Sequence, residues 1–419
     1  ICFKKSIMKI FFITSRFPRY KNDPQPIFVH YLTRELIKKG HDIYVLTSHD
    51  YKAKKFEVFE KSKVYRIQYF YPAHKQKLFY GSGLPYHVRT SFLPYIQLPI
   101  YIVLQFIKAK ILIKKINPDV IHVHWGFPQG IPALFSKKPY IITIYGGEVF
   151  LAKKFHLVKI LDKIIEKSYK TFALTKGLAD VMREFGFKSK LYNIPLGFDK
   201  KIFNPNIKNY KTIRRKYCKD NELMVLSVGR LVEKKGFEYL IKAFSITYKK
   251  KRNAKLIIVG NGYLKEKLNN LIKDMKLKDN VILAGEINHK LLPKYYKAAD
   301  IFVLPSIIDS EGDRETQGVV FAEAMATKLP VIGTNTGGIP DIISNEKVGI
   351  LVEQKNPNQL AKAMLKLLNS ENLRKYYSEN AYKHVMKNFT WETIAKEYIK
   401  IYNEIKKDKK RTGKWNFYL

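Results

Sequence analysis

The sequence predicts an α/β protein with two domains, each built on a doubly wound parallel sheet. The chain has 419 residues, which is more than one hydrophobic core usually holds. Short runs of β-branched and aromatic residues recur along it, and each is followed by a longer segment with the spacing of an amphipathic helix. This pattern restarts after a basic, poorly periodic stretch at residues 204–222. We therefore expect an N-terminal domain over residues 8–205, a C-terminal domain over 206–395, and a C-terminal helix and basic tail over 396–419 that can return to the first domain.

The expected strands are continuous apolar runs, which are typical of parallel sheets covered on both faces. In the first half they span residues 9–14, 42–48, 64–70, 119–125, 140–146 and 171–175. In the second half they span residues 224–229, 255–260, 281–285, 300–305, 331–334 and 349–352. Such sheets bind ligands beyond the carboxyl ends of their strands, so two of these domains placed face to face would share one cleft.

A long apolar segment at residues 92–113 lies between two strands of the first half. One helical face consists of Ile96, Ile100, Val103, Leu104, Ile107 and Ile111, and the opposite side is also apolar. Prolines, glutamines and lysines interrupt the segment and a strand follows promptly, so a transmembrane span is not convincing. We expect a buried crossover helix, with a helix lying on a membrane interface as the alternative.

The composition narrows the class of protein. Cys2 and Cys218 are far apart, which argues against a disulfide framework or a cysteine-based metal site and favours a reducing cytoplasm. The formal net charge is +41, with Lys and Arg spread among core-forming residues. This charge attracts polyanions such as nucleotide phosphates and anionic lipid head groups. We expect no nucleic-acid partner, because aromatic and basic residues do not gather on a recognisable module.

The segment most informative about chemistry is a polar loop at residues 309–318 that runs into a helix of small apolar residues. A helix beginning near Gly318 directs free backbone N–H groups and partial positive charge outward, and the glycine lets a phosphate approach. Glu323 lies just over one turn into that helix, where a buried carboxylate needs hydrogen-bond donors that ribose hydroxyls could supply. A favourable interaction with the helix dipole alone would explain Glu315 but not Glu323.

Glu315 and Glu323 match the E-x7-E motif of glycosyltransferase family four, which the chain resembles over nearly its full length. Other matching segments follow in the family's order, namely residues 228–231, Lys235 with Gly236, and residues 259–262, 300–306 and 330–341. The resemblance implies the GT-B fold, in which two Rossmann-like domains face a central cleft. It also implies a retaining glycosyltransferase that uses a nucleotide-diphosphate sugar.

The resemblance assigns a role to each matching residue of the second half. By the resemblance, Arg230 and Lys235 hold the donor diphosphate, which also accepts hydrogen bonds from the backbone amides of Gly318 and Val319. Glu323 binds the ribose, and Glu315 contacts the transferred sugar. Cleavage of the sugar–phosphate bond gathers negative charge on the departing diphosphate, which two cations and a helix terminus stabilise. We therefore expect no cofactor and no bound metal.

Candidate residues of the first half lie at the carboxyl ends of two strands. His122 and His124 share one face of a strand, and His124 has either a structural role or a contact to acceptor or donor. A third metal ligand at a suitable spacing is absent, which argues against zinc. Residues 143–149 are similar to the family's T-x-H-G-x-D/E turn, with Tyr145 in place of the histidine that commonly sits beside the donor sugar. A phenol can donate a hydrogen bond but cannot easily become cationic. Glu148 fits the acidic position, which we expect near the acceptor.

Two loops of the first half complete the candidate site. The family's glycine pair after the first strand is absent, and residues 22–26 stand in its place. Gly81 and Gly83 form a second glycine-rich loop, which we expect to contact the acceptor.

The resemblance implies retention of anomeric configuration, and the residues offer little for the two-carboxylate double displacement of retaining glycosidases. We therefore expect front-face substitution, in which the departing phosphate oxygen deprotonates the acceptor hydroxyl. A sugar-nucleotide epimerase or a phosphorylase on the same architecture is the first alternative, and a nucleic-acid binder, suggested by charge alone, is the second. We expect a cytoplasmic enzyme of cell-envelope polysaccharide synthesis that acts on a glycan or lipid-linked acceptor. The apolar helix, the net charge and the basic tail at residues 406–414 suggest peripheral attachment to the cytoplasmic face of an anionic membrane.

Overall fold

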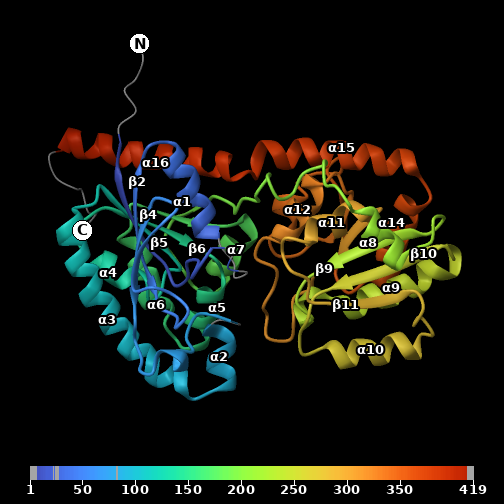
Figure 1. Ribbon diagram of the computed structural model, residues 1–419, viewed down its shortest axis with the longest axis horizontal. Coiled ribbons are helices and arrows are strands. Elements are labelled where there is room, and N and C mark those ends of the chain that lie inside the picture. Colours follow the sequence, from blue (N-terminus) through green and yellow to red (C-terminus); the bar gives the residue numbers. More distant parts are fainter. Residues whose placement is uncertain (1–6, 22, 24–27, 82–83, 413–419) are drawn as a thin grey trace, which may run out of the picture. The chain divides into compact units, whose positions relative to one another are not determined.

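The computed structural model describes residues 7–21, 23, 28–81 and 84–412. These residues form two compact units, each with its own parallel sheet (Figure 1). The first unit comprises the chain up to residue 174, residues 178–195, and the chain from Trp391 onward. The second unit comprises residues 175–177 and 196–390.

The unit boundaries differ from those expected from the sequence. The chain enters the second unit at residue 196 rather than 206. The reason is apolar packing, because Phe198 and Phe203 are buried in the core of the second unit. The backbone N–H of Phe198 also donates to the carbonyl of Phe389 across 2.9 Å. The last helix begins at Trp391 rather than residue 396 and belongs to the first unit.

The sheet of the first unit has the strand order β3-β4-β2-β1-β5-β6-β7-β8 among the described residues. The strands are β1 (Lys9–Ile13), β2 (Asp42–Ser48), β3 (Phe56–Phe59), β4 (Ser62–Ile67), β5 (Val120–His124), β6 (Tyr140–Ile144), β7 (Lys170–Ala173) and β8 (Leu191–Asn193). Neighbours pair in parallel except β3, which runs antiparallel to β4. Neither β3 nor β8 was expected, since both are short and neither is buried along its length. The central strands β5 and β6 are buried throughout, as their apolar sequences predict.

Helices of the first unit follow the strands in the crossover pattern. They are α1 (Phe28–Lys38), α2 (Leu84–Thr90), α3 (Leu93–Ile116), α4 (Gly130–Leu134), α5 (Gly147–Lys154), α6 (Val158–Glu166), α7 (Lys176–Glu184), whose first two residues belong to the second unit, and α16 (Trp391–Thr412). A short 3-10 turn, η1 (Ala73–Lys75), precedes α2. Catalytic loops are expected where β5 and β6 end, because ligands bind at the carboxyl edge of parallel sheets.

The helix α3 does not have the orientation expected of a buried crossover helix. Its inward face carries Gln97, Tyr101 and Gln105, and both glutamines are fully buried. The face of isoleucines, valine and leucine is exposed, so the prediction of a buried crossover helix was wrong for this face. Hydrogen bonds to groups inside the unit offset the cost of burying these two glutamines. Gln97 accepts from the Lys77 N–H at 3.0 Å, and Gln105 donates to the Tyr101 hydroxyl at 2.9 Å.

The sheet of the second unit has the order β11-β10-β9-β12-β13-β14, all pairs being parallel. The strands are β9 (Leu223–Val228), β10 (Ala254–Val259), β11 (Val281–Gly285), β12 (Ile301–Leu304), β13 (Val331–Thr334) and β14 (Ile350–Val352). Around them lie α8 (Lys211–Tyr217), α9 (Phe237–Lys250), α10 (Lys265–Asp274), α11 (Leu292–Ala298), α12 (Val319–Ala326), α13 (Ile339–Ile342), α14 (Pro357–Leu368) and α15 (Glu371–Asn388). A 3-10 turn, η2 (Glu233–Lys235), follows β9.

The final helix α16 is held in the first unit by buried polar contacts as well as by packing on α1. The hydroxyl of Tyr402 lies 2.7 Å from His122 Nδ1, and the hydroxyl of Tyr398 lies 2.8 Å from Thr143 Oγ1. His122 Nε2 completes the network with Thr143 Oγ1 at 2.9 Å. His122 therefore has both ring nitrogens occupied, which gives it a structural role.

Replacing Tyr402 by Phe should destabilise the first unit by about 1–3 kcal/mol, because a buried nitrogen of His122 loses its partner. The second unit contains no tryptophan, so tryptophan fluorescence during urea unfolding reports on the first unit. Tyr51→Phe, at an exposed position of the first unit, is the matched control. Equal urea midpoints for Tyr402→Phe and the control would contradict the structural role of this contact.

Candidate functional site

The second unit brings Lys235 and Glu315 into direct contact, and both side chains are largely buried. Lys235 ends the turn η2, and its aliphatic stem lies over Gly229. Gly236 follows in a left-handed conformation (φ 66°), where a Cβ would collide with the carbonyl oxygen of Pro305. Glycine at this position therefore allows the turn carrying Lys235 to pack against the end of β12.

Three cations keep Glu315 ionised. Burial alone would raise the pKa of Glu315, but the charges of Lys235, Lys234 and Arg230 outweigh it and hold the pKa below its usual range. Lys234 is itself paired with Asp313 at 2.9 Å. The result is a carboxylate surrounded by positive charge.

Arg230 lies on the loop after β9, and its side chain is exposed. Among the described residues it makes no side-chain hydrogen bond or ion pair, so its guanidinium has donors to offer to an anion. Two glycines of the neighbouring loop, Gly260 and Gly262, leave room for this loop, because a Cβ on either would collide with the Gly229 or Leu231 carbonyl. The Leu231 N–H also donates to the Asn261 carbonyl at 2.9 Å. Residues 259–262 therefore serve as support for the loop of Arg230.

Gly318 caps the start of α12 in a left-handed conformation (φ 77°). A Cβ there would collide with the Phe321 ring and lie 3.5 Å from Glu315 Cγ. Val319 is the first residue of the helix and is half-buried, so its N–H belongs to the group that a helix leaves without an internal partner. The helix start thus adjoins the Lys235–Glu315 pair.

The turn after β13 fixes the backbone of Glu315. The N–H of Gly338 donates to the Glu315 carbonyl at 2.9 Å. Gly337 has φ 56°, and a Cβ there would collide with the same carbonyl. The glycine pair of residues 330–341 is therefore explained by close approach to the loop of Glu315.

Glu323 has hydrogen-bond donors that the sequence analysis missed. Tyr296 of α11 donates to one carboxylate oxygen at 2.9 Å, and His289 Nε2 lies 3.4 Å from the other. The inference that Glu323 lacks donors without a ribose was therefore wrong. His289 follows β11 at the carboxyl edge of the sheet, where ligands collect, and this position is the signal that could have singled it out.

In the first unit, His124 and Tyr145 form a hydrogen-bonded pair. His124 Nδ1 lies 2.7 Å from the Tyr145 hydroxyl, and its other ring nitrogen is buried without a partner among the described residues. Burial lowers the pKa of His124 to about 3, so the imidazole is neutral at physiological pH. The pair at the ends of β5 and β6 therefore offers hydrogen bonds but no positive charge.

Glu148 joins the same two strand ends. One carboxylate oxygen accepts from the Tyr145 N–H at 3.0 Å and from the Gly126 N–H at 3.4 Å. The other oxygen is buried without a partner among the described residues. Burial raises the pKa of Glu148 to about 7, although the backbone hydrogen bonds oppose this shift. Glu148 thus links the loops that follow β5 and β6, and its second carboxylate oxygen makes no hydrogen bond among the described residues.

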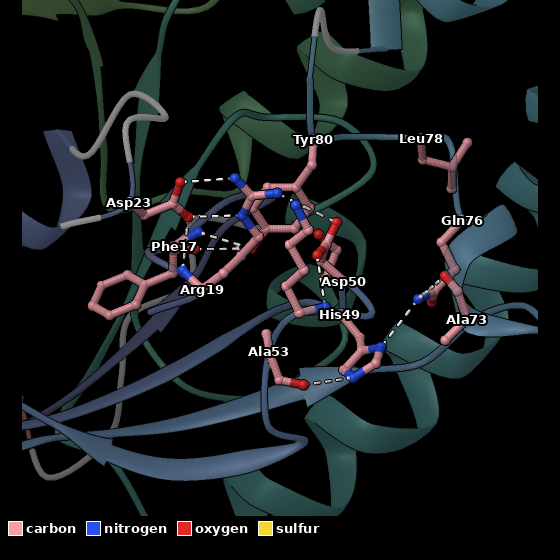
Figure 2. A network of polar contacts seen from close by, with 12 residues as sticks. Phe17, Arg19, Asp23, His49, Asp50, Ala53, Ala73, Gln76, Leu78 and Tyr80 are labelled. Atoms are coloured by element: carbon pink, nitrogen blue, oxygen red, sulfur yellow. Dashed lines mark hydrogen bonds and ion pairs between the residues drawn. The ribbon is translucent and has the colours of Figure 1, made fainter. Parts of the chain in front are cut away.

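Figure 2 shows a network around Arg19 in the loop after β1. Arg19 binds Asp23 with two hydrogen bonds of 2.8 Å and lies 3.6 Å from Asp50. Its guanidinium stands over the Tyr80 ring at 5.0 Å, and the Tyr80 hydroxyl donates to the Phe17 carbonyl at 2.9 Å. The hydrogen bond to Asp23 is the main cause that raises the pKa of Arg19, against the effect of burial.

Asp23 of this network belongs to residues 22–26, the segment that stands in place of the family's glycine pair, and the other residues of that segment lie outside the described part of the chain. Gly81 directly follows Tyr80, is exposed and has φ 75°, while Gly83 lies outside the described residues. Within the described part of the chain, no group of three or more His, Cys, Asp or Glu side chains is arranged to hold a metal ion.

Both halves of the chain match glycosyltransferase family models. Residues 25–201 match the family model described as Glycosyltransferase Family 4, and residues 209–384 match the model described as Glycosyl transferases group 1. An uncharacterised glycosyltransferase of Methanocaldococcus jannaschii is 27% identical over 94% of this chain and 98% of its own length. A GDP-mannose-dependent phosphatidylinositol monomannoside mannosyltransferase of Mycobacterium tuberculosis is 30% identical over 50% of this chain and 55% of its own.

Solved structures show the same fold. Sucrose-phosphate synthase from Thermosynechococcus elongatus has a TM-score of 0.76 at 22% identity, covering 96% of this chain and all of that one. HepE of Anabaena in complex with UDP-glucose has a TM-score of 0.68 at 15% identity, covering 95% of this chain and 100% of that one. The two α/β units therefore have the GT-B architecture.

His289→Gln should reduce stability at low pH and have less effect at high pH. Burial alone would lower the pKa of His289, but the hydrogen bond and charge of Glu323, aided by Asp199, raise it above 6.5. The protonated form thus stabilises the fold below pH 6.5, and this stabilisation is lost as the pH rises through the raised pKa. Calorimetric melting at about pH 5.5 and about pH 8.5 measures it, the effect being modest because the imidazole is partly exposed.

The exposed His74 of the first unit provides the control, and His74→Gln should melt like the parent protein at both pH values. A melting difference for His289→Gln that stays the same at both pH values would contradict the pairing of an imidazolium with Glu323.

Proposed function

The chain belongs to glycosyltransferase family four, and we propose that it transfers a sugar from a nucleotide-diphosphate donor to a glycan or lipid-linked acceptor with retention of anomeric configuration. The contact between Lys235 and Glu315 beside the start of α12 supports this proposal most. A carboxylate among three cations and a helix N-terminus is suited to a ligand that has both hydroxyls and phosphates.

In the proposed donor complex, the diphosphate binds Arg230, Lys235 and the first amides of α12. Arg230 has unused donors, and an ammonium has three, so Lys235 can bind phosphate while it keeps its contact with Glu315. Glu315 then receives hydroxyls of the transferred sugar. Because positive charge is already in place, the proposal includes no metal ion.

The pentose of the donor is proposed to bind Glu323. This carboxylate accepts from Tyr296 and His289, yet two oxygens offer about four acceptor positions in all. Ribose hydroxyls can therefore add to these contacts or displace the half-exposed imidazole of His289. The buried Tyr296 hydroxyl keeps Glu323 oriented in either case.

The proposed reaction is a front-face substitution. The bond between the anomeric carbon and the diphosphate oxygen breaks first, and its electron pair leaves with the diphosphate. The acceptor oxygen then bonds to the oxocarbenium-like carbon on the same face, and its proton passes to the departing phosphate oxygen. Arg230, Lys235 and the helix start act by stabilising the charge that gathers on the diphosphate.

Residues of the first unit are proposed to position the acceptor. His124 and Glu148 each keep one buried polar atom without a partner among the described residues, so each can bind a hydroxyl. Tyr145 orients His124, and the loop of Gly81 is the further candidate contact. HepE binds UDP-glucose and the mycobacterial relative acts on a phosphatidylinositol mannoside, which supports a nucleotide-sugar donor and a lipid-linked or glycan acceptor.

Lys235→Ala should lower kcat by about 100-fold or more while the donor KM changes much less, because the cation acts mainly on charge that develops during bond cleavage. The sugar nucleotide that best raises the melting temperature provides the donor for this assay. Lys249→Ala, at the exposed far end of α9, is the control. Melting curves without donor must accompany the rates, since Glu315 loses its partner. Unchanged kcat in folded Lys235→Ala would reject the assigned role.

A donor with an α-linked sugar should give an α-linked product. The coupling constant of the anomeric proton in the NMR spectrum of the product reports this configuration. A β-linked product would refute retention. Conversion of the donor without any acceptor would instead favour an epimerase, and a requirement for free phosphate would favour a phosphorylase.

A further inference from the structure

The outer face of α3 presents a continuous apolar stripe to solvent. The stripe consists of Ile96, Ile100, Val103, Leu104, Ile107 and Ile111, all exposed, at the spacing of one helical face. It extends about 22 Å along the helix. Soluble proteins seldom leave such a contiguous apolar surface uncovered, so the stripe marks an interaction site.

The inward face of α3 fixes this orientation. Gln97 bonds to the backbone of Lys75 and Lys77, and Gln105 bonds to the buried Tyr101. Rotating the helix to bury its isoleucines would expose these residues and break their hydrogen bonds. By length and composition alone α3 could also cross a membrane. Among the described elements, α2, α4 and β4 pack against it and leave one face uncovered, which allows contact with a surface but not a span.

The charges around the stripe identify what it contacts. Lys108, Lys110, Lys114 and Lys115 are exposed on the same helix, and Lys75 and Lys77 are exposed near its start. No Asp or Glu occurs anywhere between Lys61 and Pro118. Lysines beside an apolar helix face are the pattern of helices that lie in the interface of an anionic bilayer.

A second copy of the chain fits this surface poorly. Two stripes packed against each other would bring their lysines together, and the segment supplies no carboxylate to neutralise them. Like charges placed face to face oppose association, whereas anionic head groups attract every one of these lysines.

We propose that the outer face of α3 is a membrane-docking surface that inserts its apolar stripe among the acyl chains of an anionic bilayer while the flanking lysines bind head groups. Figure 1 shows α3 along the outer side of the first unit, next to α4. The catalytic proposal is independent of this surface, since the stripe contains none of the residues assigned to donor or acceptor.

Vesicle flotation at low salt tests the proposal. The full chain should float with vesicles of equal parts phosphatidylcholine and phosphatidylglycerol, and much less with phosphatidylcholine alone. Ile107→Glu should weaken binding by about tenfold or more, because the side chain no longer inserts. Ile160→Glu on α6 is matched in residue type, exposure (49% against 50% for Ile107) and charge change, and should bind like the parent chain.

Ile107→Lys separates insertion from simple charge attraction. Insertion predicts weaker binding than the parent chain, whereas attraction by charge alone predicts equal or tighter binding and would overturn the proposal. Absence of flotation with anionic vesicles would overturn it as well. Light scattering tests the alternative that a second copy of the chain binds the stripe. A concentration-dependent dimer that Ile107→Glu abolishes would support that alternative and overturn the proposal. Unchanged melting temperatures establish that both variants fold.

Discussion

The ion pair of Lys235 and Glu315 organises the candidate site of the second unit, because each buried charge costs less free energy when the other lies beside it. This ion pair explains why glycines stand at positions 229, 236 and 337. They bring three loops close enough to seat the pair, and a side chain at the latter two positions would collide with backbone. Breaking such a pair leaves an unpaired buried charge, which commonly costs about 3–5 kcal/mol. A diphosphate ligand would add negative charge where Lys235, Lys234 and Arg230 together outnumber the carboxylates of Glu315 and Asp313.

The polar residues of the first unit work by a different principle. Burial keeps His122 and His124 neutral, and their partners are hydroxyls of Tyr and Thr. Glu148 differs from them, because burial raises its pKa to about 7. The contact of Lys235 with Glu315 thus holds fixed charge, whereas His124 and Tyr145 at the ends of β5 and β6 are neutral hydrogen-bonding groups. Such a division suits a reaction in which charge changes on the leaving diphosphate while the acceptor needs mainly to be oriented.

The buried strands of both sheets could be predicted from sequence because they leave long apolar runs, whereas the short, partly exposed β3 and β8 could not. The loop of Glu315 and Gly318 could be found because its residues are close in sequence. Contacts made across the chain could not. His122 meets Tyr402, which lies 280 positions later, and Glu323 meets Tyr296 on another helix. The expected burial of α3 was wrong for its outer face, since apolar periodicity identifies a face of a helix but does not tell whether protein or another medium covers it.

The helix α16 has a consequence for how the protein is made. It supplies Tyr398 and Tyr402 to the interior of the first unit, although it is synthesised after the whole of the second. On a ribosome, the later half can therefore finish folding before the earlier half is complete. Until the last helix emerges, the side of α1 on which it packs stays uncovered and Nδ1 of His122 lacks its Tyr402 partner. The nascent N-terminal half should therefore be the part that chaperones must shield longest.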